Sequence, residues 1–168
     1  MNLTIMDIEA SGFGRGSYPI EIGIAMSDGS SQCLLVRPHN DWNHWEQEAE
    51  ALHGISRNTL LESGLVVDEV ALLLNQWLKN STVYTDAWAN DSCWLGLLYE
   101  TAGVVQQFKI ESLRTVISED QVELWHPVKD QITKDFSFQR HRASNDARIL
   151  QMTYSRTLEQ LQSTAIDP

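Results

Sequence analysis

The sequence has few cysteines, no long hydrophobic run and a shortage of basic residues. Its two cysteines, Cys33 and Cys93, exclude a disulfide-rich scaffold and a zinc site built from cysteine pairs, and they predict reduced thiols in the cytoplasm. No apolar stretch reaches the roughly 18 residues of a membrane span. The first residues also lack the features of a signal peptide. We therefore expect a cytoplasmic protein without a membrane partner.

The shortage of basic residues limits the kind of nucleic acid contact that the chain can make. Twelve Lys and Arg stand against 23 Asp and Glu, which gives a formal net charge of -11. This balance excludes broad coating of duplex DNA by phosphate neutralisation. It is compatible with a nuclease, because a site built from carboxylates and divalent cations is itself acidic without its metal.

The length and the absence of internal breaks predict one domain. The 168 residues match the usual size of a single domain, and the sequence contains no repeat, linker or low-complexity segment. We assign residues 1–168 to that domain and expect the tail to fray after about residue 162.

Hydrophobic patterning predicts strands first and helices later. We expect strands at residues 3–9, 20–26, 32–37, 82–85 and 108–110. We expect helices at 56–61, 66–79, 90–101 and 143–162, and two helical pieces within 111–135 with Pro127 as the break or start. The first three strands read as a hairpin meander. The whole pattern predicts an α/β fold whose mixed sheet carries helices on both faces.

Two acids lie at the end of the first strand. Asp7 and Glu9 are two residues apart, so they share one strand face with Leu3 and Ile5. Because both faces are mostly apolar, this strand is expected to be central and buried. Two carboxylates at its end would be desolvated and would repel each other, and a hard divalent cation such as Mg²⁺ or Mn²⁺ relieves both costs. The alternative is that Asp7 caps a turn and Glu9 points to water.

Further candidate ligands follow the strand at residues 82–85 and precede the last helix. Asp91 lies near a helix start, where capping is the alternative role, and Asp86 is its rival. His141 and Asp146 are five residues apart, which on one continuous helix would point them about 140° apart. They can meet only if His141 precedes the helix. The alternative is a surface histidine beside an N-terminal aspartate.

Several segments together resemble the DEDDh branch of the 3′→5′ exonucleases, which includes polymerase proofreading subunits, RNase T-like enzymes and oligoribonucleases. The matching segments are Asp7-Ile8-Glu9-Ala10-Ser11-Gly12, Pro19-Ile20-Glu21-Ile22-Gly23, Leu52-His53-Gly54-Ile55-Ser56, Asp91-Ser92-Cys93-Trp94-Leu95 and His141-Arg142-Ala143-Ser144-Asn145-Asp146-Ala147. Their order is that of the family, and they span residues 3 to about 155. The pattern fits Asp91 rather than Asp86. This sequence departs from the family pattern at Ala10, where the family often has Thr. It also lacks the usual Asn four residues before Asp91.

The resemblance implies a fold, a metal set and a reaction. The fold would be an RNase H-like sheet of five strands with the site at the carboxyl end of the first. Two Mg²⁺ or Mn²⁺ ions would be held by the four acids Asp7, Glu9, Asp91 and Asp146, with His141 as general base on the attacking water. The substrates would be single-stranded DNA or RNA 3′ ends, and the products nucleoside 5′-monophosphates.

The resemblance also suggests where the terminal nucleotide binds. Backbone groups of Ala10, Ser11 and Gly12 could meet it, and Phe13 or the loop at Leu52 and His53 could stack on its base. Phe13 could equally be a loop anchor. Five basic residues near the last motif could guide a nucleic acid backbone or form a solvated face: Lys129, Lys134, Arg140, Arg142 and Arg148.

Other functions remain open from the sequence. One alternative is an oligoribonuclease-like enzyme restricted to very short oligonucleotides. Another is a non-catalytic accessory subunit that binds a polymerase or RNA-processing partner. Six tryptophans are many for this length, and a homodimer interface could use some of them, although most are expected in the core. Nothing in the sequence distinguishes DNA from RNA.

Overall fold

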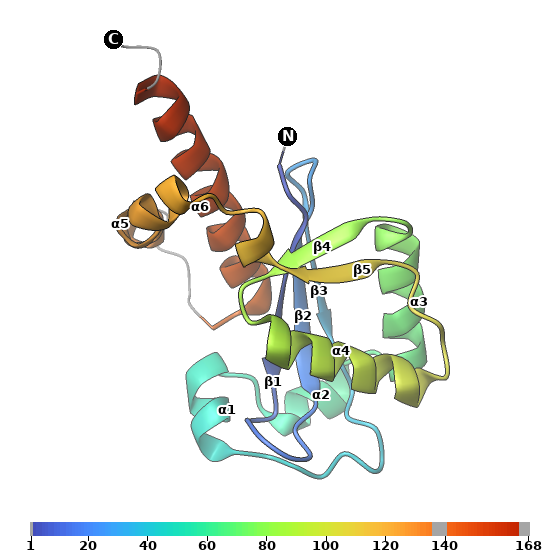
Figure 1. The fold of residues 1–168 in the computed structure, drawn as a ribbon. Coiled ribbons are helices and arrows are strands. Elements are labelled where there is room, and N and C mark those ends of the chain that lie inside the picture. The colour runs from blue at the N-terminus through green and yellow to red at the C-terminus, as the bar shows by residue number, and fades with distance from the viewer. Residues whose placement is uncertain (1, 136–140, 165–168) are drawn as a thin grey trace.

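The computed structural model describes residues 2–135 and 141–164, and a sheet lies at its centre (Figure 1). This sheet has five strands. The strand order is β3-β2-β1-β4-β5. The strands are β1 (Ile5–Ala10), β2 (Pro19–Ala25), β3 (Ser31–Leu35), β4 (Thr82–Thr85) and β5 (Lys109–Ser112). The first three pair antiparallel as a meander, whereas β4 pairs parallel with both β1 and β5. The predicted mixed sheet is confirmed. Most of the predicted frayed tail, residues 165–168, lies outside the described residues.

Strand β1 is central because β2 and β4 flank it on either side. Its alternating side chains enter two different cores. Met6 and Ile8 belong to the larger core, whereas Ile5 belongs to a second core that includes Ala147 and Leu150. Asp7 and Glu9 therefore point toward the face of the sheet that carries the last helix.

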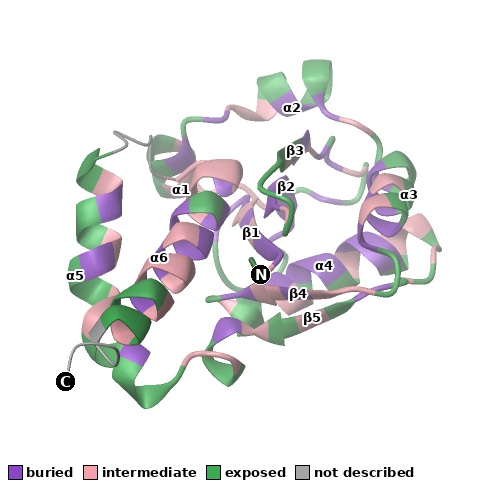
Figure 2. Ribbon diagram, turned by 90° about the horizontal axis from the view of Figure 1, so that it is seen from above, coloured by how far each residue is buried: buried purple, intermediate pink, exposed green. Residues whose placement is uncertain are grey.

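Helices cover both faces of the sheet, as predicted (Figure 2). They are α1 (Gln47–His53), α2 (Arg57–Ser63), α3 (Val67–Leu78), α4 (Trp88–Ala102), α5 (Glu119–Asp135) and α6 (Ala143–Thr164), with a short 3-10 turn, η1 (Leu113–Thr115). Helices α3 and α4 contribute Leu74 and Leu95 to the larger core. Helix α6 packs against β1 and β2 on the opposite face, and α5 packs against α6.

The structure of residues 111–135 differs from the prediction of two helical pieces. Glu111 and Ser112 continue β5, where they pair with Tyr84 and Thr85 of β4. Helix α5 then runs unbroken through Pro127. Proline removes one backbone hydrogen bond inside a helix. Because Pro127 and Glu123, whose carbonyl group loses its partner, are both exposed, water can satisfy that carbonyl group.

Helix α1 is not among the predicted helices, and Leu52 and His53 were expected in a loop. They form the last turn of this helix, which Gly54 ends with a φ of 71° and a backbone N–H that donates to the Glu50 carbonyl oxygen. The signal was present, because Gln, Glu, Ala and Leu favour helices and dominate residues 47–53.

The start of α6 lies directly on the backbone of β2. A Cβ added at Gly23 would sit 2.1 Å from the backbone carbon of Ala143 and the backbone nitrogen of Ser144. Only a glycine permits this approach. The neighbouring Glu21, fully buried, accepts hydrogen bonds from Nε (3.0 Å) and Nη2 (2.6 Å) of Arg142 and from the backbone N–H of Ala143 (2.8 Å). These contacts fix the first turn of α6 at the carboxyl end of β1.

Candidate active site

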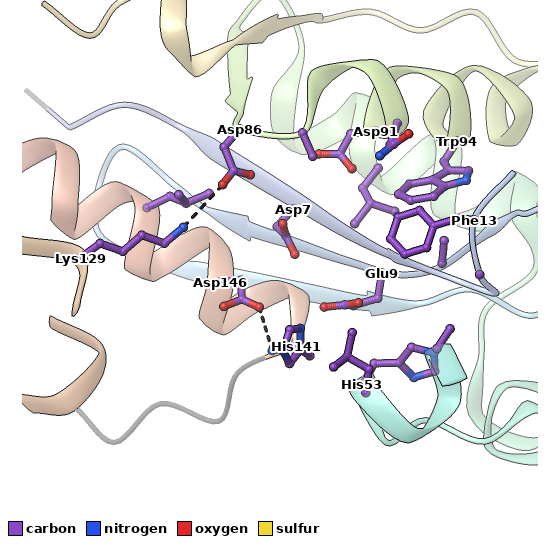
Figure 3. A pocket seen from close by; sticks show the side chains of 18 residues that line it. Asp7, Glu9, Phe13, His53, Asp86, Asp91, Trp94, Lys129, His141 and Asp146 are labelled. Atoms are coloured by element: carbon purple, nitrogen blue, oxygen red, sulfur yellow. Dashed lines mark hydrogen bonds and ion pairs between the residues drawn. The ribbon is translucent and has the colours of Figure 1, made fainter. Parts of the chain in front are cut away.

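A cavity of about 210 Å³ opens at the carboxyl end of β1 (Figure 3). It is lined by all five residues that the sequence proposed for catalysis: Asp7 and Glu9 on β1, Asp91 in the first turn of α4, Asp146 in the first turn of α6, and His141 just before α6. Three segments that are distant in the sequence therefore direct their acids into one space.

In the described part of the chain, the side chains of Glu9, His141 and Asp146 form a group that could hold a metal ion. One ligand atom from each lies within 4.8 Å of the others, close enough to hold a metal ion. His141 has a left-handed backbone, with φ of 59°, and its N–H donates a 2.8 Å hydrogen bond to Oδ2 of Asp146. This turn brings the imidazole to the cavity from outside the helix, as the five-residue spacing required.

The two other acids, Asp7 and Asp91, have surroundings that disfavour their charged forms. Burial raises the pKa of Asp7 well above its usual value, and the charges of neighbouring carboxylates raise it further. Burial also raises the pKa of Asp91 to about 7, although the Thr85 hydroxyl donates a hydrogen bond to its Oδ2 and opposes the shift. A divalent cation would relieve both the desolvation and the repulsion.

An apolar end of the cavity lies beside the acids. The Phe13 side chain is 64% exposed, and its ring centroid lies 6.1 Å from that of Trp94. Leu52, at the end of α1, is also exposed and lines the cavity. The Phe13 loop is held by Glu46, whose carboxylate accepts a 3.2 Å hydrogen bond from the Phe13 N–H. This end offers aromatic and aliphatic side chains against which a base can pack.

Among the predicted substrate contacts, Ala10, Gly12, Phe13, Leu52 and His53 line the cavity, and Ser11 does not. The Ser11 N–H donates to the carbonyl oxygen of Tyr18, and its own carbonyl oxygen accepts from the N–H of Glu46. Its backbone groups are therefore used within the fold, so the structure does not support the predicted contact of Ser11 with a nucleotide.

His53 offers a hydrogen-bond donor at the cavity. Its Nδ1 accepts a 3.0 Å hydrogen bond from the N–H of Ile55, which leaves the proton on Nε2. Burial lowers the pKa of His53, so the ring is neutral near pH 7. In the described residues Nε2 is buried and has no hydrogen-bond partner. A bound ligand with an oxygen at this point would satisfy it.

The structure adds Asp86 and Lys129 to the cavity lining. Their side chains form an ion pair of 3.6 Å, on the side of the acids away from Phe13 (Figure 3). The position of Asp86 after a strand end was a signal for this edge. Lys129 was expected only as one of five basic residues near the last motif, because its place at the cavity depends on how α5 packs against α6.

The other basic residues near the last motif have different surroundings. Arg142 is bound to Glu21, and Nη1 of Arg148 lies 3.4 Å from the Gly29 carbonyl oxygen. Lys134 is exposed, and Arg140 lies outside the described residues. Of the described members of this group, Lys129 alone lines the cavity.

No protein-family model and no curated protein matches the chain. Solved structures do resemble it. Exonuclease I from Methylocaldum szegediense superposes with a TM-score of 0.71 at 15% identity, over 96% of this chain and 41% of that one. The fold is similar to that of exonuclease I. The RNase H-like expectation is thus confirmed, and this chain spans about two fifths of the exonuclease I chain.

Two structures of the Escherichia coli enzyme agree. Exonuclease I in complex with a dA16 oligonucleotide gives a TM-score of 0.70 at 11% identity, over 95% of this chain and 41% of the other. A zinc-bound complex of exonuclease I with single-stranded DNA gives 0.70 at 12% identity, over 97% and 42%. Within residues 2–135 and 141–164, no helix is long and apolar enough to cross a membrane.

Proposed function

We propose that the chain is a metal-dependent 3′→5′ exonuclease of the DEDDh type. It would hydrolyse the terminal phosphodiester of single-stranded DNA or RNA and release nucleoside 5′-monophosphates. The observation that carries this proposal is the convergence of Asp7, Glu9, Asp91 and Asp146 on one cavity, with His141 at the same place. The complexes of exonuclease I with single-stranded oligonucleotides support the substrate class.

The donor set fits divalent cations. Four carboxylates supply the oxygen ligands that Mg²⁺ and Mn²⁺ prefer, and the raised pKa values of Asp7 and Asp91 reflect a site in which negative charge lacks compensation. When bound, two such ions would neutralise the carboxylates, polarise the scissile phosphodiester and lower the pKa of the attacking water. Glu9 and Asp146, whose carboxylates already lie close together, would hold these ions together with Asp7 and Asp91.

His141 would take the proton of the attacking water. Histidine is the commonest general base, and this one precedes α6 on a turn fixed by the hydrogen bond from its N–H to Asp146. Because that bond uses the backbone, the imidazole remains available to the cavity. The same carboxyl group thus positions the base and contributes to the metal set.

The apolar end would bind the terminal nucleoside. Phe13 and Leu52 would pack against the base, since every base offers a face for stacking. The unsatisfied Nε2–H of His53 would donate to an oxygen of the nucleotide. The backbone of Ala10 and Gly12 would approach the same nucleotide from the edge of β1.

A product ladder tests the proposal. Single-stranded DNA and RNA of 2, 3, 8 and 20 nucleotides, labelled at the 5′ end, are incubated with Mg²⁺, Mn²⁺ or EDTA. We expect stepwise shortening from the 3′ end with either metal and none with EDTA. Cleavage confined to the two shortest lengths would instead identify an oligoribonuclease-like enzyme. No shortening with Mn²⁺ would favour the accessory subunit.

A matched pair of variants separates the site from the fold. Asp146→Asn should abolish hydrolysis and leave the circular dichroism spectrum unchanged. Asp68→Asn is the control, because Asp68 is an exposed aspartate in the first turn of α3, away from the cavity. Wild-type turnover in Asp146→Asn would refute the assignment.

A further inference from the structure

A second hollow of about 370 Å³ adjoins the candidate active site, between η1 and α5. Its lining includes Leu113, Arg114, Trp125 and His126, and it shares Asp86 and Lys129 with the active-site cavity. We call this hollow the upstream groove. The Asp86–Lys129 ion pair lines both hollows where they adjoin.

The order of groups along the active-site cavity gives a direction to a bound strand. Figure 3 shows Phe13 and Trp94 on one side of the acids, and Lys129 on the other. With the terminal nucleoside on the aromatic side and its phosphodiester at the acids, the next nucleotide must leave toward Lys129. The upstream groove begins at that point.

The lining of the upstream groove has the chemistry that binds single strands. Its cationic groups, Arg114 and Lys129, occur in a chain of net charge -11, and its aromatic group is the half-buried Trp125. Single-strand sites combine positive charge along the backbone with aromatic side chains that stack on bases. The one carboxylate of the lining, Asp86, is paired with Lys129.

We propose that the upstream groove binds the nucleotides that precede the terminal one in a single-stranded substrate. Arg114 and Lys129 contact backbone phosphates, and Trp125 stacks on a base. This inference rests on the proposed exonuclease function, because that function sets the position of the scissile bond. It predicts that substrates longer than a dinucleotide gain affinity from the groove.

Arg114 is the sharpest position for a test. Its side chain is exposed, and in the described residues its guanidinium has no hydrogen bond or ion pair, so its replacement leaves the core untouched. Trp125 is less suitable because it packs against the core around Leu113. Lys109→Glu is the control. It makes the same charge change at the exposed first residue of β5, at the end of that strand away from η1, and Lys109 does not line the groove.

The experiment compares two substrates. One is a single-stranded octamer, and the other is the p-nitrophenyl ester of thymidine 5′-monophosphate, which has no upstream nucleotide. In Arg114→Glu the ratio of kcat/KM for the octamer to kcat/KM for the ester should fall about tenfold, the effect of one lost charge-assisted contact. In Lys109→Glu the ratio should stay constant. A ratio that also stays constant in Arg114→Glu would overturn the proposal.

A binding measurement separates failure of the groove from failure of the exonuclease proposal. If the wild-type protein cleaves neither substrate, the exonuclease proposal fails, and a fluorescent octamer then tests the groove directly. The dissociation constant should rise in Arg114→Glu and not in Lys109→Glu. In Arg114→Gln the slope of log K against log salt should weaken by about 0.7, as for one lost phosphate contact on a single strand. No octamer binding, or equal effects of the two charge reversals, would overturn the groove.

Discussion

Gly23 of β2 and Ala143, the first residue of α6, are in direct backbone contact. The position of a Cβ at residue 23, 2.1 Å from the Ala143 backbone carbon, leaves no room for any side chain. Because Asp146 and His141 lie within one turn of Ala143, this contact determines where both enter the active-site cavity. It ties the geometry of the site to the packing of the core.

Gly23→Ala should damage activity and stability together. We expect a loss of about 1–3 kcal/mol in the free energy of unfolding from overpacking, and a fall in kcat of about 100-fold from displacement of Asp146. Urea unfolding and oligomer hydrolysis measure the two effects. Gly96→Ala is the control, because Gly96 lies exposed inside α4 with nothing near its Cβ, and it should gain about 0.5–1 kcal/mol. Wild-type activity in Gly23→Ala would show that the contact does not position the site.

His141→Ala should slow the reaction far more than it weakens binding. The loss of a general base lowers kcat by about 10²–10⁴-fold, whereas the dissociation constant for an octamer in Ca²⁺ should change little. The control is His39→Ala, which removes an imidazole that pairs with Asp41 and does not line the cavity. Equal losses in rate and binding would contradict the role of His141 as a base.

The buried Asp91 predicts a pH-dependent stability in EDTA. Its pKa is raised from 3.8 to about 7 in the folded state, so the contribution of Asp91 to stability is full below about pH 4 and is lost as the pH rises through 7. Relative to Asp91→Asn, the unfolding free energy of the wild type should fall by about 3 kcal/mol between pH 4.5 and pH 8. Urea unfolding of both proteins across this range measures the difference. A difference that does not change with pH would contradict the raised pKa.

Phe13→Ala should raise KM with little effect on stability. Its ring is 64% exposed, so we expect the free energy of unfolding to change by less than about 0.5 kcal/mol. The loss of one stacked base should raise KM about tenfold, and Phe13→Tyr should restore it. An unchanged KM in Phe13→Ala would show that the ring anchors its loop instead of binding substrate.

Much of the fold and the position of the acids followed from short-range rules. The mostly apolar faces of residues 3–9 predicted a central strand, and the two-residue spacing placed Asp7 and Glu9 on one face; the structure has both. The geometry of a helix required His141 to precede α6, and its left-handed backbone meets that requirement. Such rules depend only on neighbouring residues, which the sequence contains directly.

Features that depend on packing between distant segments did not follow. The ion pair of Asp86 and Lys129 requires α5 to lie beside the bend that follows β4, and nothing in either segment specifies that distance. The backbone of Ser11 was expected to meet a nucleotide, yet it bonds with Tyr18 and Glu46, which only the folded loops bring near. Pro127 was expected to break or start a helix. It lies instead on the exposed side of α5, where water can satisfy the carbonyl group that loses its hydrogen bond.

Glu21 and Glu9 face each other across the β1–β2 ladder, so two carboxylates stand next to one another on the same side of the sheet. Glu21 receives a counter-ion that is part of the polypeptide, the guanidinium of Arg142. In our proposal, the counter-ion of Glu9 is a divalent metal ion that exchanges with the solvent. The Arg142–Glu21 pair would therefore hold the first turn of α6 in place even when a chelator removes the metal, whereas the chemistry would depend wholly on the metal supply.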